Sequence, residues 1–230
     1  MDLRKVQSMT GVVPLVAYLL FHLWETSYAS SGRLTFSSRV TGSGGGALSL
    51  VLEVVLVLLP LLVHAGLGLW LALRDRGSAE AGSYGSRGMR NVQRVTGVVA
   101  LLFVLVHVAQ TWMGKLAGGD ATLAYDTLRA QVGMPVYLVL YVVGITCVCF
   151  HVAQGVGAFA HAWGLAKGAG QVRALRFAGV ALGVVLWVVS LNTVSHFAVG
   201  RTLLGPSSAD IEPGAPTAEP PVGSAGEGGT

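Results

Sequence analysis

The run QRVTGVVALLFVLVHVAQTWM, from Gln93 to Met113, decides the fold of this chain. A helix needs about 20 mostly apolar residues to cross a bilayer, and this run has that length and composition. It carries one histidine, His107, which lies in the apolar part of the run, far from the polar residues at its start. Because lipid offers an imidazole no hydrogen-bonding partner, an ionisable side chain within a span is by default a candidate functional group. The run therefore predicts a membrane helix with a site inside it.

The N-terminal stretch QSMTGVVPLVAYLLFH, from Gln7 to His22, repeats this design. Both stretches begin with a glutamine, continue with Thr-Gly-Val-Val and lead to a histidine, His107 in one and His22 in the other. The repeat predicts that the first and third helices cross the membrane in the same direction and carry equivalent sites.

Composition supports a membrane protein. The chain is 53% hydrophobic and 11% charged, whereas soluble domains carry about 25% charged residues. The net charge of +4 does not indicate a nucleic-acid partner, because the basic residues lie in short connections. Cys147 and Cys149 lie two apart in an apolar run, so neither a disulfide framework nor a metal cluster is expected. No cleavable signal peptide is expected, because the first apolar run lacks a small-residue cleavage site.

The predicted fold class is all-α, an integral membrane bundle of five transmembrane helices. The bundle is expected within residues 1–204, with helices at about 9–28, 47–73, 92–113, 134–160 and 174–199. The connections are Ser/Gly-rich at 29–46, Arg/Gly/Ser-rich at 74–91, mixed at 114–133 and basic at 161–173. The Pro/Gly/Ala/Ser/Glu-rich tail, 205–230, has almost nothing to bury and is predicted to be disordered.

The basic residues predict the orientation, because cytoplasmic connections are enriched in lysine and arginine. With the N-terminus inside, ten basic residues face the cytoplasm: Arg4, Lys5, Arg74, Arg76, Arg87, Arg90, Arg94, Lys167, Arg173 and Arg176. Five face the other side: Arg33, Arg39, Lys115, Arg129 and Arg201. The N-terminus is therefore expected in the cytoplasm and the C-terminus outside.

The first four predicted helices carry one histidine each: His22, His64, His107 and His151. With a helical rise of about 1.5 Å per residue, His22 and His107 lie roughly 20 Å from the cytoplasmic side. Helices two and four run the other way, so His64 and His151 lie roughly 25 Å from the outer side. The histidines thus form one outer and one inner level.

Two neutral imidazoles at one level, on facing helices, suit the two axial positions of a haem iron. Small residues on the histidine faces, Gly11, Gly68 and Gly155, leave room for a flat macrocycle or a neighbouring backbone. Nothing matches the C-x-x-C-H motif, so the predicted cofactors are two non-covalent haem b groups. The alternative is that each histidine is a core residue bonded to a backbone carbonyl. For His161, beyond helix four, an interfacial role is favoured.

With these residues assembled, the chain resembles the membrane-anchor cytochrome b subunit of succinate:quinone oxidoreductases, of the single-polypeptide, five-helix, two-haem type. The similar segments extend from Val6 to about Phe197. They are S-x-x-G-V-x-P from Ser8, L-E-x-x-x-x-x-L-P-L-x-x-H from Leu52 to His64, Q-R-x-T-G from Gln93, H-V at His107, Y-x-V-G from Tyr141 and the pair Trp163–Gly164.

The resemblance implies that His22 and His107 ligate a distal haem and His64 and His151 a proximal one. It also implies a multi-pass location in a bacterial inner membrane. On the cytoplasmic face the chain would dock an iron–sulfur subunit and, through it, a flavoprotein that interconverts succinate and fumarate. Electrons would pass between the iron–sulfur subunit and membrane quinone, which is menaquinone in this anchor type. The chain would have no dicarboxylate site and would contribute the quinone site; the oligomeric state stays open.

Further roles follow from the same resemblance. Glu53 is a candidate for proton exchange with quinone, with a boundary glutamate as the alternative; Glu25 is expected nearer water. The candidates for contacts with proximal haem propionates are Gln7, Ser8, Gln93 and Arg94. Arg94 is the strongest, since arginine pairs bidentately with carboxylates, although it also serves as a positive-inside anchor. The family's usual cation at the end of helix four is absent.

Two other functions remain open. One is a transporter or channel whose histidines relay protons, which would show inverted repeats and polar residues along a midplane path. The other is the haem-bearing anchor of another quinone-linked oxidoreductase, which haem count and partner subunits would distinguish. No nucleic-acid partner is expected in any of these cases.

Overall fold

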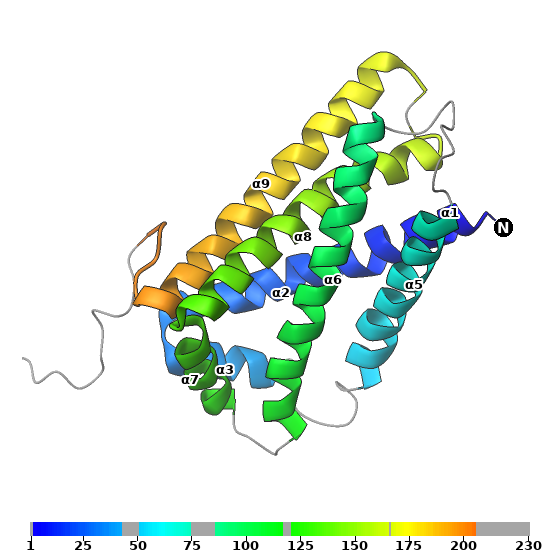
Figure 1. The fold of residues 1–230 in the computed structure, drawn as a ribbon. Coiled ribbons are helices and arrows are strands. Elements are labelled where there is room, and N and C mark those ends of the chain that lie inside the picture. The colour runs from blue at the N-terminus through cyan, green and yellow to red at the C-terminus, as the bar shows by residue number, and fades with distance from the viewer. Residues whose placement is uncertain (1, 43–50, 75–85, 117–120, 166, 206–230) are drawn as a thin grey trace, which may run out of the picture.

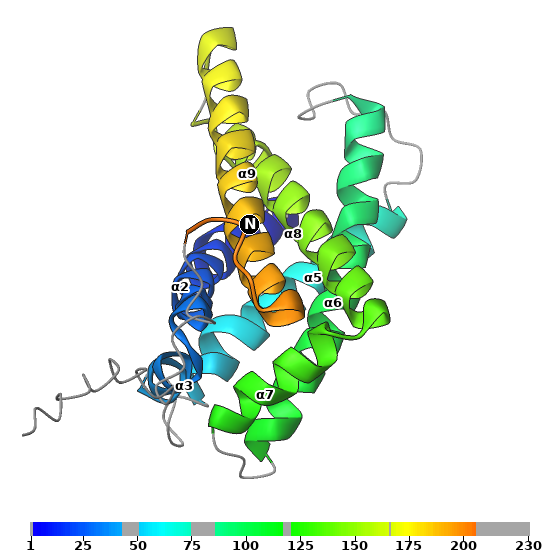
Figure 2. The same cartoon turned by 90° about the vertical axis from the view of Figure 1, so that its left-hand side faces the viewer.

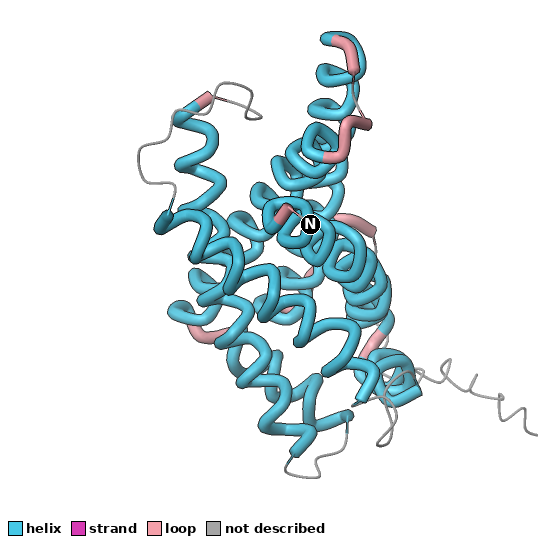
Figure 3. Tube along the Cα trace, turned by 90° about the vertical axis from the view of Figure 1, so that its right-hand side faces the viewer, coloured by secondary structure: helices cyan, strands magenta, loops and turns pink. Residues whose placement is uncertain are grey.

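The computed structural model describes residues 2–42, 51–74, 86–116, 121–165 and 167–205, and all of its regular elements in this part are helices (Figures 1 and 3). Five segments are long and apolar enough to cross a membrane: Leu3–Ser31, Val51–Arg74, Arg87–Thr111, Pro135–Ala162 and Ala169–Val199. The predicted all-α fold with five such helices is confirmed for the described residues. The first and last begin several residues before the predicted positions, because their polar first turns continue the helix beyond the apolar run.

The first two spans contain π-helical turns beside prolines. The first is built from α1 (Leu3–Thr10), η1 (Gly11–Val16), α2 (Ala17–Ser27) and a final turn, η2 (Tyr28–Ser31). Pro14 lies within η1. The second consists mainly of η3 (Val54–Leu58) and α5 (Leu59–Arg74), with Pro60 in the first turn of α5. Since proline lacks an N–H and its ring displaces a preceding carbonyl, a wider turn keeps the helix continuous there.

The remaining spans are α6 (Arg87–Leu116), α8 (Pro135–Ala162) and α9 (Ala169–Val199). The last two lie side by side along much of their lengths (Figures 1 and 2). At their contact a Cβ on Gly179 would overlap the carbonyl oxygen of Ala153, and one on Gly183 would lie 2.7 Å from the Ala153 Cβ. Small residues four apart let two membrane helices approach this closely. This contact holds α8, which carries one of the four histidines, in place.

Two shorter helices lie in connections between the predicted spans. They are α3 (Arg33–Gly42) and α7 (Ala121–Val132), and they contact each other at the end of the bundle where α9 ends (Figure 2). Phe36 of α3 and Tyr125 of α7 pack edge-on, with ring centroids 5.6 Å apart, and both contact Phe197 of α9. An ion pair between Arg33 and Asp126, 2.5 Å, links the two helices at their surface. The described parts of these two connections are thus largely helical, because packing stabilises short helices that local sequence does not reveal.

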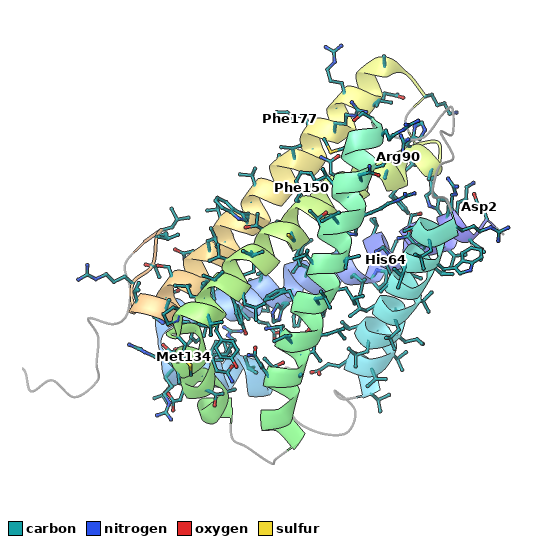
Figure 4. All side chains as sticks on the ribbon, in the orientation of Figure 1. Asp2, His64, Arg90, Met134, Phe150 and Phe177 are labelled. Atoms are coloured by element: carbon teal, nitrogen blue, oxygen red, sulfur yellow. The ribbon has the colours of Figure 1, made fainter. Side chains whose placement is uncertain are left out.

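Apolar side chains also cover the outside of the bundle. Leu62, Val136 and Phe177 are 65%, 71% and 75% exposed, and Phe177 points away from the other helices (Figure 4). A soluble monomer rarely exposes such apolar surface over several helices, so these faces suit lipid. The predicted disorder of the tail falls on residues that lie, apart from Gly205, outside the described part of the chain.

Candidate functional site

The structure brings the four histidines together as two pairs. His22 of α2 faces His107 of α6, with ring centroids 5.9 Å apart and ring planes at 71°. His64 of α5 faces His151 of α8, with centroids 6.0 Å apart and planes at 83°. These are the two pairs that helix direction and depth predict from the sequence. Each pair joins one of the first two spans to one of the next two.

The separation within each pair fits two imidazoles on opposite sides of one iron. A metal–imidazole bond of about 2 Å, with about 1 Å more from each nitrogen to its ring centroid, places two axial rings about 6 Å apart. Among the described residues no three or more His, Cys, Asp or Glu side chains cluster as a metal site. A zinc ion usually takes four such ligands, whereas a macrocycle leaves only two axial positions for the protein. Two-ligand sites therefore fit haem.

Backbone carbonyls orient the rings of the His64–His151 pair. Nδ1 of His64 lies 2.7 Å from the carbonyl oxygen of Gln7, and Nδ1 of His151 lies 3.1 Å from that of Gln93. Since a carbonyl only accepts, each Nδ1 carries the hydrogen and donates it. In a neutral imidazole this leaves the Nε2 lone pair free to bind a metal, the arrangement that orienting partners give metal-binding histidines.

Two glycines make room for these same rings. A Cβ on Gly11 would overlap the ring of His64, and a Cβ on Gly97 would lie 2.8 Å from Cε1 of His151. Each glycine lies four residues after its glutamine, so the carbonyl and the gap share one helix face. The repeated Gln-x-x-Thr-Gly motif thus serves a histidine on the neighbouring span. Gly11, which the sequence analysis places on the face of His22, lies against His64.

The glutamine side chains also belong to this pair. The Nε2 atom of Gln93 donates to the carbonyl oxygen of His151, 3.0 Å away. Its Oε1 atom is buried without a hydrogen-bond partner among the described residues. A Cβ on Gly68 would lie 3.4 Å from Nε2 of Gln7, and one on Gly155 would lie 3.8 Å from Nε2 of Gln93. These two glycines therefore face the glutamine amides.

Aromatic side chains surround the His22–His107 pair. His107 stacks on Phe103, with centroids 5.8 Å apart and planes at 23°, and its Nδ1 lies 3.1 Å from the hydroxyl of Tyr141. His22 stacks on Tyr18 one turn before it, with centroids 5.7 Å apart and planes at 19°. The two pairs are thus held differently, one by backbone carbonyls and the other largely by aromatic rings.

The predicted propionate candidates lie near the start of α1 and α6. The Ser8 hydroxyl accepts a hydrogen bond from the indole of Trp163, 3.3 Å away, and the Lys5 ammonium lies 5.5 Å from the centroid of that ring. Arg94 is half-buried and follows Gln93 directly on α6. Gln7, Ser8, Gln93 and Arg94 therefore occupy the helix turns that adjoin the His64–His151 pair.

The predicted quinone residue lies nearer the other pair. Glu53 is half-buried immediately before η3, and η3 contacts η1 of the first span. Glu53 precedes His64 by eleven residues on the same span, roughly 16 Å along the helix, so it is remote from the His64–His151 pair. His161 is exposed at the end of α8 and belongs to neither pair.

Sequence reasoning missed two groups. Phe103 and the hydroxyl of Tyr141 contact His107; the Y-x-V-G motif marks Tyr141, although nothing in the sequence gives its partner. His196 is almost fully buried near the end of α9, and its Nε2 lies 2.8 Å from the hydroxyl of Tyr125. This contact could not be foreseen, because Tyr125 lies on α7 outside the predicted spans.

Comparison with known proteins gives one informative match. The chain is similar to the succinate dehydrogenase cytochrome b558 subunit of Bacillus subtilis (strain 168), with 28% identity over 194 residues. The match covers 84% of this chain and 95% of that protein. No protein-family model matches the chain, and no solved structure matches it. The similarity and the five long apolar helices support a multi-pass membrane protein.

Proposed function

We propose that this chain is the cytochrome b membrane anchor of a succinate:quinone oxidoreductase. It carries electrons between an iron–sulfur subunit and membrane quinone, menaquinone in this type of anchor, through two haem b groups. The observation that carries the proposal is the pair of two-histidine sites with ring centroids 5.9 and 6.0 Å apart. Similarity to a relative named as a succinate dehydrogenase cytochrome subunit supports it along most of the chain.

Four histidines hold the two groups: His22 and His107 ligate the distal haem, and His64 and His151 ligate the proximal haem. When bound, haem supplies an iron that alternates between ferric and ferrous states and so carries single electrons. The chain's own part is to present Nε2 of each ring, to fix the orientation of His64, His107 and His151 from Nδ1, and to surround the site with apolar helices. Burial and hydrogen bonding then set the redox potentials.

Polar residues beside the His64–His151 pair hold the propionates in this proposal. The guanidinium of Arg94 offers a planar pair of donors to one carboxylate. The hydroxyl of Ser8, which donates to the carbonyl oxygen of Lys5 in the structure, would turn to offer another donor. The side-chain Nε2 groups of Gln7 and Gln93 add further donors. Propionates would thus lie toward the turns that begin α1 and α6.

Quinone chemistry is proposed at the other pair. The carboxylate of Glu53 exchanges protons with the quinone as electrons pass, so that the reduced quinone becomes neutral quinol. Support comes from the half-buried position of Glu53 immediately before η3, a segment that contacts η1 of the first span. At the edge of a membrane span the carboxylate can take a proton from water, and the carboxylic acid so formed can pass it to the reduced quinone.

The proposed partners follow from the similarity. An iron–sulfur subunit docks on the cytoplasmic face and carries the flavoprotein, which performs the dicarboxylate chemistry. The exposed apolar faces contact lipid of a bacterial inner membrane. The N-terminus then lies in the cytoplasm and the C-terminus outside, as the distribution of basic residues indicates.

Purification of the native complex from membranes, through a tag on this chain, tests the proposal. An iron–sulfur protein and a flavoprotein are expected to copurify, and succinate is expected to reduce the bound b-type haem. Haem that is reduced by formate or hydrogen, but not by succinate, would instead assign the chain to another oxidoreductase. Folded protein with no haem would instead favour a transporter or channel whose histidines relay protons.

A further inference from the structure

We infer that Tyr141 is a positioning residue for His107 and that its hydroxyl lowers the redox potential of the haem held by the His22–His107 pair alone. The inference rests on the proposed function, since it concerns a haem bound at these histidines. It adds a role for a residue that contacts a proposed iron ligand at Nδ1 without being a ligand itself. It also implies that the potential of one haem can be changed without changing the other.

The direction of the hydrogen bond follows from its surroundings. The hydroxyl of Tyr141 lies 3.1 Å from Nδ1 of His107 and donates its own hydrogen to Oε1 of Gln110, 3.4 Å away. A phenol has one hydrogen to donate, so toward the imidazole it accepts. Nδ1 of His107 therefore carries the hydrogen, and the Nε2 lone pair is left for iron. Tyr141 is 5% exposed, so water does not compete strongly for this bond.

The same face of α8 also fixes the plane of the His107 ring. Gly144 lies three residues after Tyr141, and a Cβ there would overlap the ring of Phe103. Phe103 fills this gap, packs edge-on against Tyr141 with centroids 5.3 Å apart and stacks on His107. One turn of α8 thus supplies both a hydrogen-bond acceptor for the imidazole and the space for the ring that stacks on it.

The other pair is held differently, which gives the inference its specificity. His64 and His151 donate to the backbone carbonyls of Gln7 and Gln93, and no side-chain substitution removes those acceptors. His107 donates to a side-chain hydroxyl that a single substitution deletes. An acceptor on Nδ1–H makes the imidazole a stronger electron donor, which stabilises ferric over ferrous iron and lowers the potential. Removing the acceptor should therefore raise one potential only.

The test is a spectroscopic redox titration of the purified holo-complex carrying Tyr141→Phe, which keeps the ring and its packing. Haem content is counted first. We expect two haems per chain in wild type and in the variant, with one midpoint potential shifted upward and the other unchanged. Tyr137→Phe removes the same group one turn earlier on α8, and it is expected to leave both potentials at the wild-type values.

A second variant covers the case in which Tyr141→Phe loses haem. Gln110→Leu removes the acceptor that orients the hydroxyl, and it is expected to shift the potential of the same haem in the same direction. Two retained haems with unchanged potentials, or an equal shift of both, would overturn the inference. Wild-type complex without two haems would instead count against the proposed function, so the two failures are distinguishable.

Discussion

At the scale of single residues, the Gln-x-x-x-Gly spacing positions the two histidines of the His64–His151 pair. On one helix face it presents a carbonyl that accepts from Nδ1 and, one turn later, a gap that admits the imidazole. Gln7 with Gly11 does this for His64, and Gln93 with Gly97 does it for His151. Both histidines of one pair are therefore held by the same arrangement on two different spans.

The space beside Gly97 and Gly11 predicts the effect of adding a methyl group at either position. In Gly97→Ala the new Cβ would lie 2.8 Å from Cε1 of His151, closer than carbon atoms normally approach. We expect the displaced ring to lose its haem, so that a pyridine haemochrome assay of purified protein falls from two haems per chain toward one. Gly11→Ala should remove the same haem, because its methyl group would overlap the ring of His64.

The matched control is Gly66→Ala, two residues after His64, where an added Cβ meets nothing within 4 Å. It should retain both haems. Equal haem content in the Gly97→Ala and Gly66→Ala variants would refute the role given to the gap.

The pairs of histidines could be predicted from the sequence, but their surroundings could not. Intervals along the chain and alternating helix direction place His22 level with His107 and His64 level with His151. The partner of each Nδ1 depends on how neighbouring helices rotate about their axes, which periodicity does not specify. Gly11 illustrates this: its place in the sequence suggests the face of His22, whereas packing turns it toward His64.

At the scale of helices, α9 positions α8 through two glycines. The pattern Gly179-x-x-x-Gly183 is visible in the sequence and is typical of close helix contacts in membranes. It could have predicted the α8–α9 contact, although it does not name the partner helix. The short helices α3 and α7 could not be found in the same way, because their packing around Phe36 and Tyr125, rather than an apolar run, stabilises them.

The close contact between α8 and α9 predicts a loss of stability when a larger side chain replaces Gly179. In Gly179→Ala the methyl group would overlap the carbonyl oxygen of Ala153, and since backbone cannot rotate away, α8 and α9 must separate. Overpacking of this kind destabilises by about 1–3 kcal/mol. Thermal unfolding in detergent, followed by far-UV circular dichroism, should show a lower midpoint for this variant.

Gly170→Ala serves as the control because a Cβ there meets nothing within 4 Å. Since alanine is a better helix former than glycine, it should be neutral or slightly stabilising. A Gly179→Ala protein as stable as Gly170→Ala would contradict the packing described for α9.

At the scale of the whole molecule, the four histidines connect the first four spans in crossed pairs. One pair joins α2 to α6 and the other joins α5 to α8. Each site therefore takes one histidine from the first two spans and one from the next two. A bundle of this kind assembles its sites only when all four helices are in place. Apolar outer faces, such as those at Leu62 and Val136, fit a bundle surrounded by lipid.

The charge distribution predicts the orientation of the whole chain. Ten basic residues on one side against five on the other favour a cytoplasmic N-terminus and an outer C-terminus. Alkaline phosphatase fused after Leu204 should be active, because the enzyme folds only outside the cytoplasm, while a fusion after Arg74 should be inactive. The reverse pattern would place the N-terminus outside and exchange the depths of the two pairs.

The most direct test of the central claim is the haem count of the purified chain with single ligand substitutions. Two b-type haems per chain are expected in a reduced-minus-oxidised spectrum with a pyridine haemochrome assay. His107→Ala and His151→Ala should each leave one haem, and the two variants should retain spectrally different ones, because the histidines belong to different pairs. Well-folded wild-type protein without haem, or loss of the same haem in both variants, would contradict the two-site account.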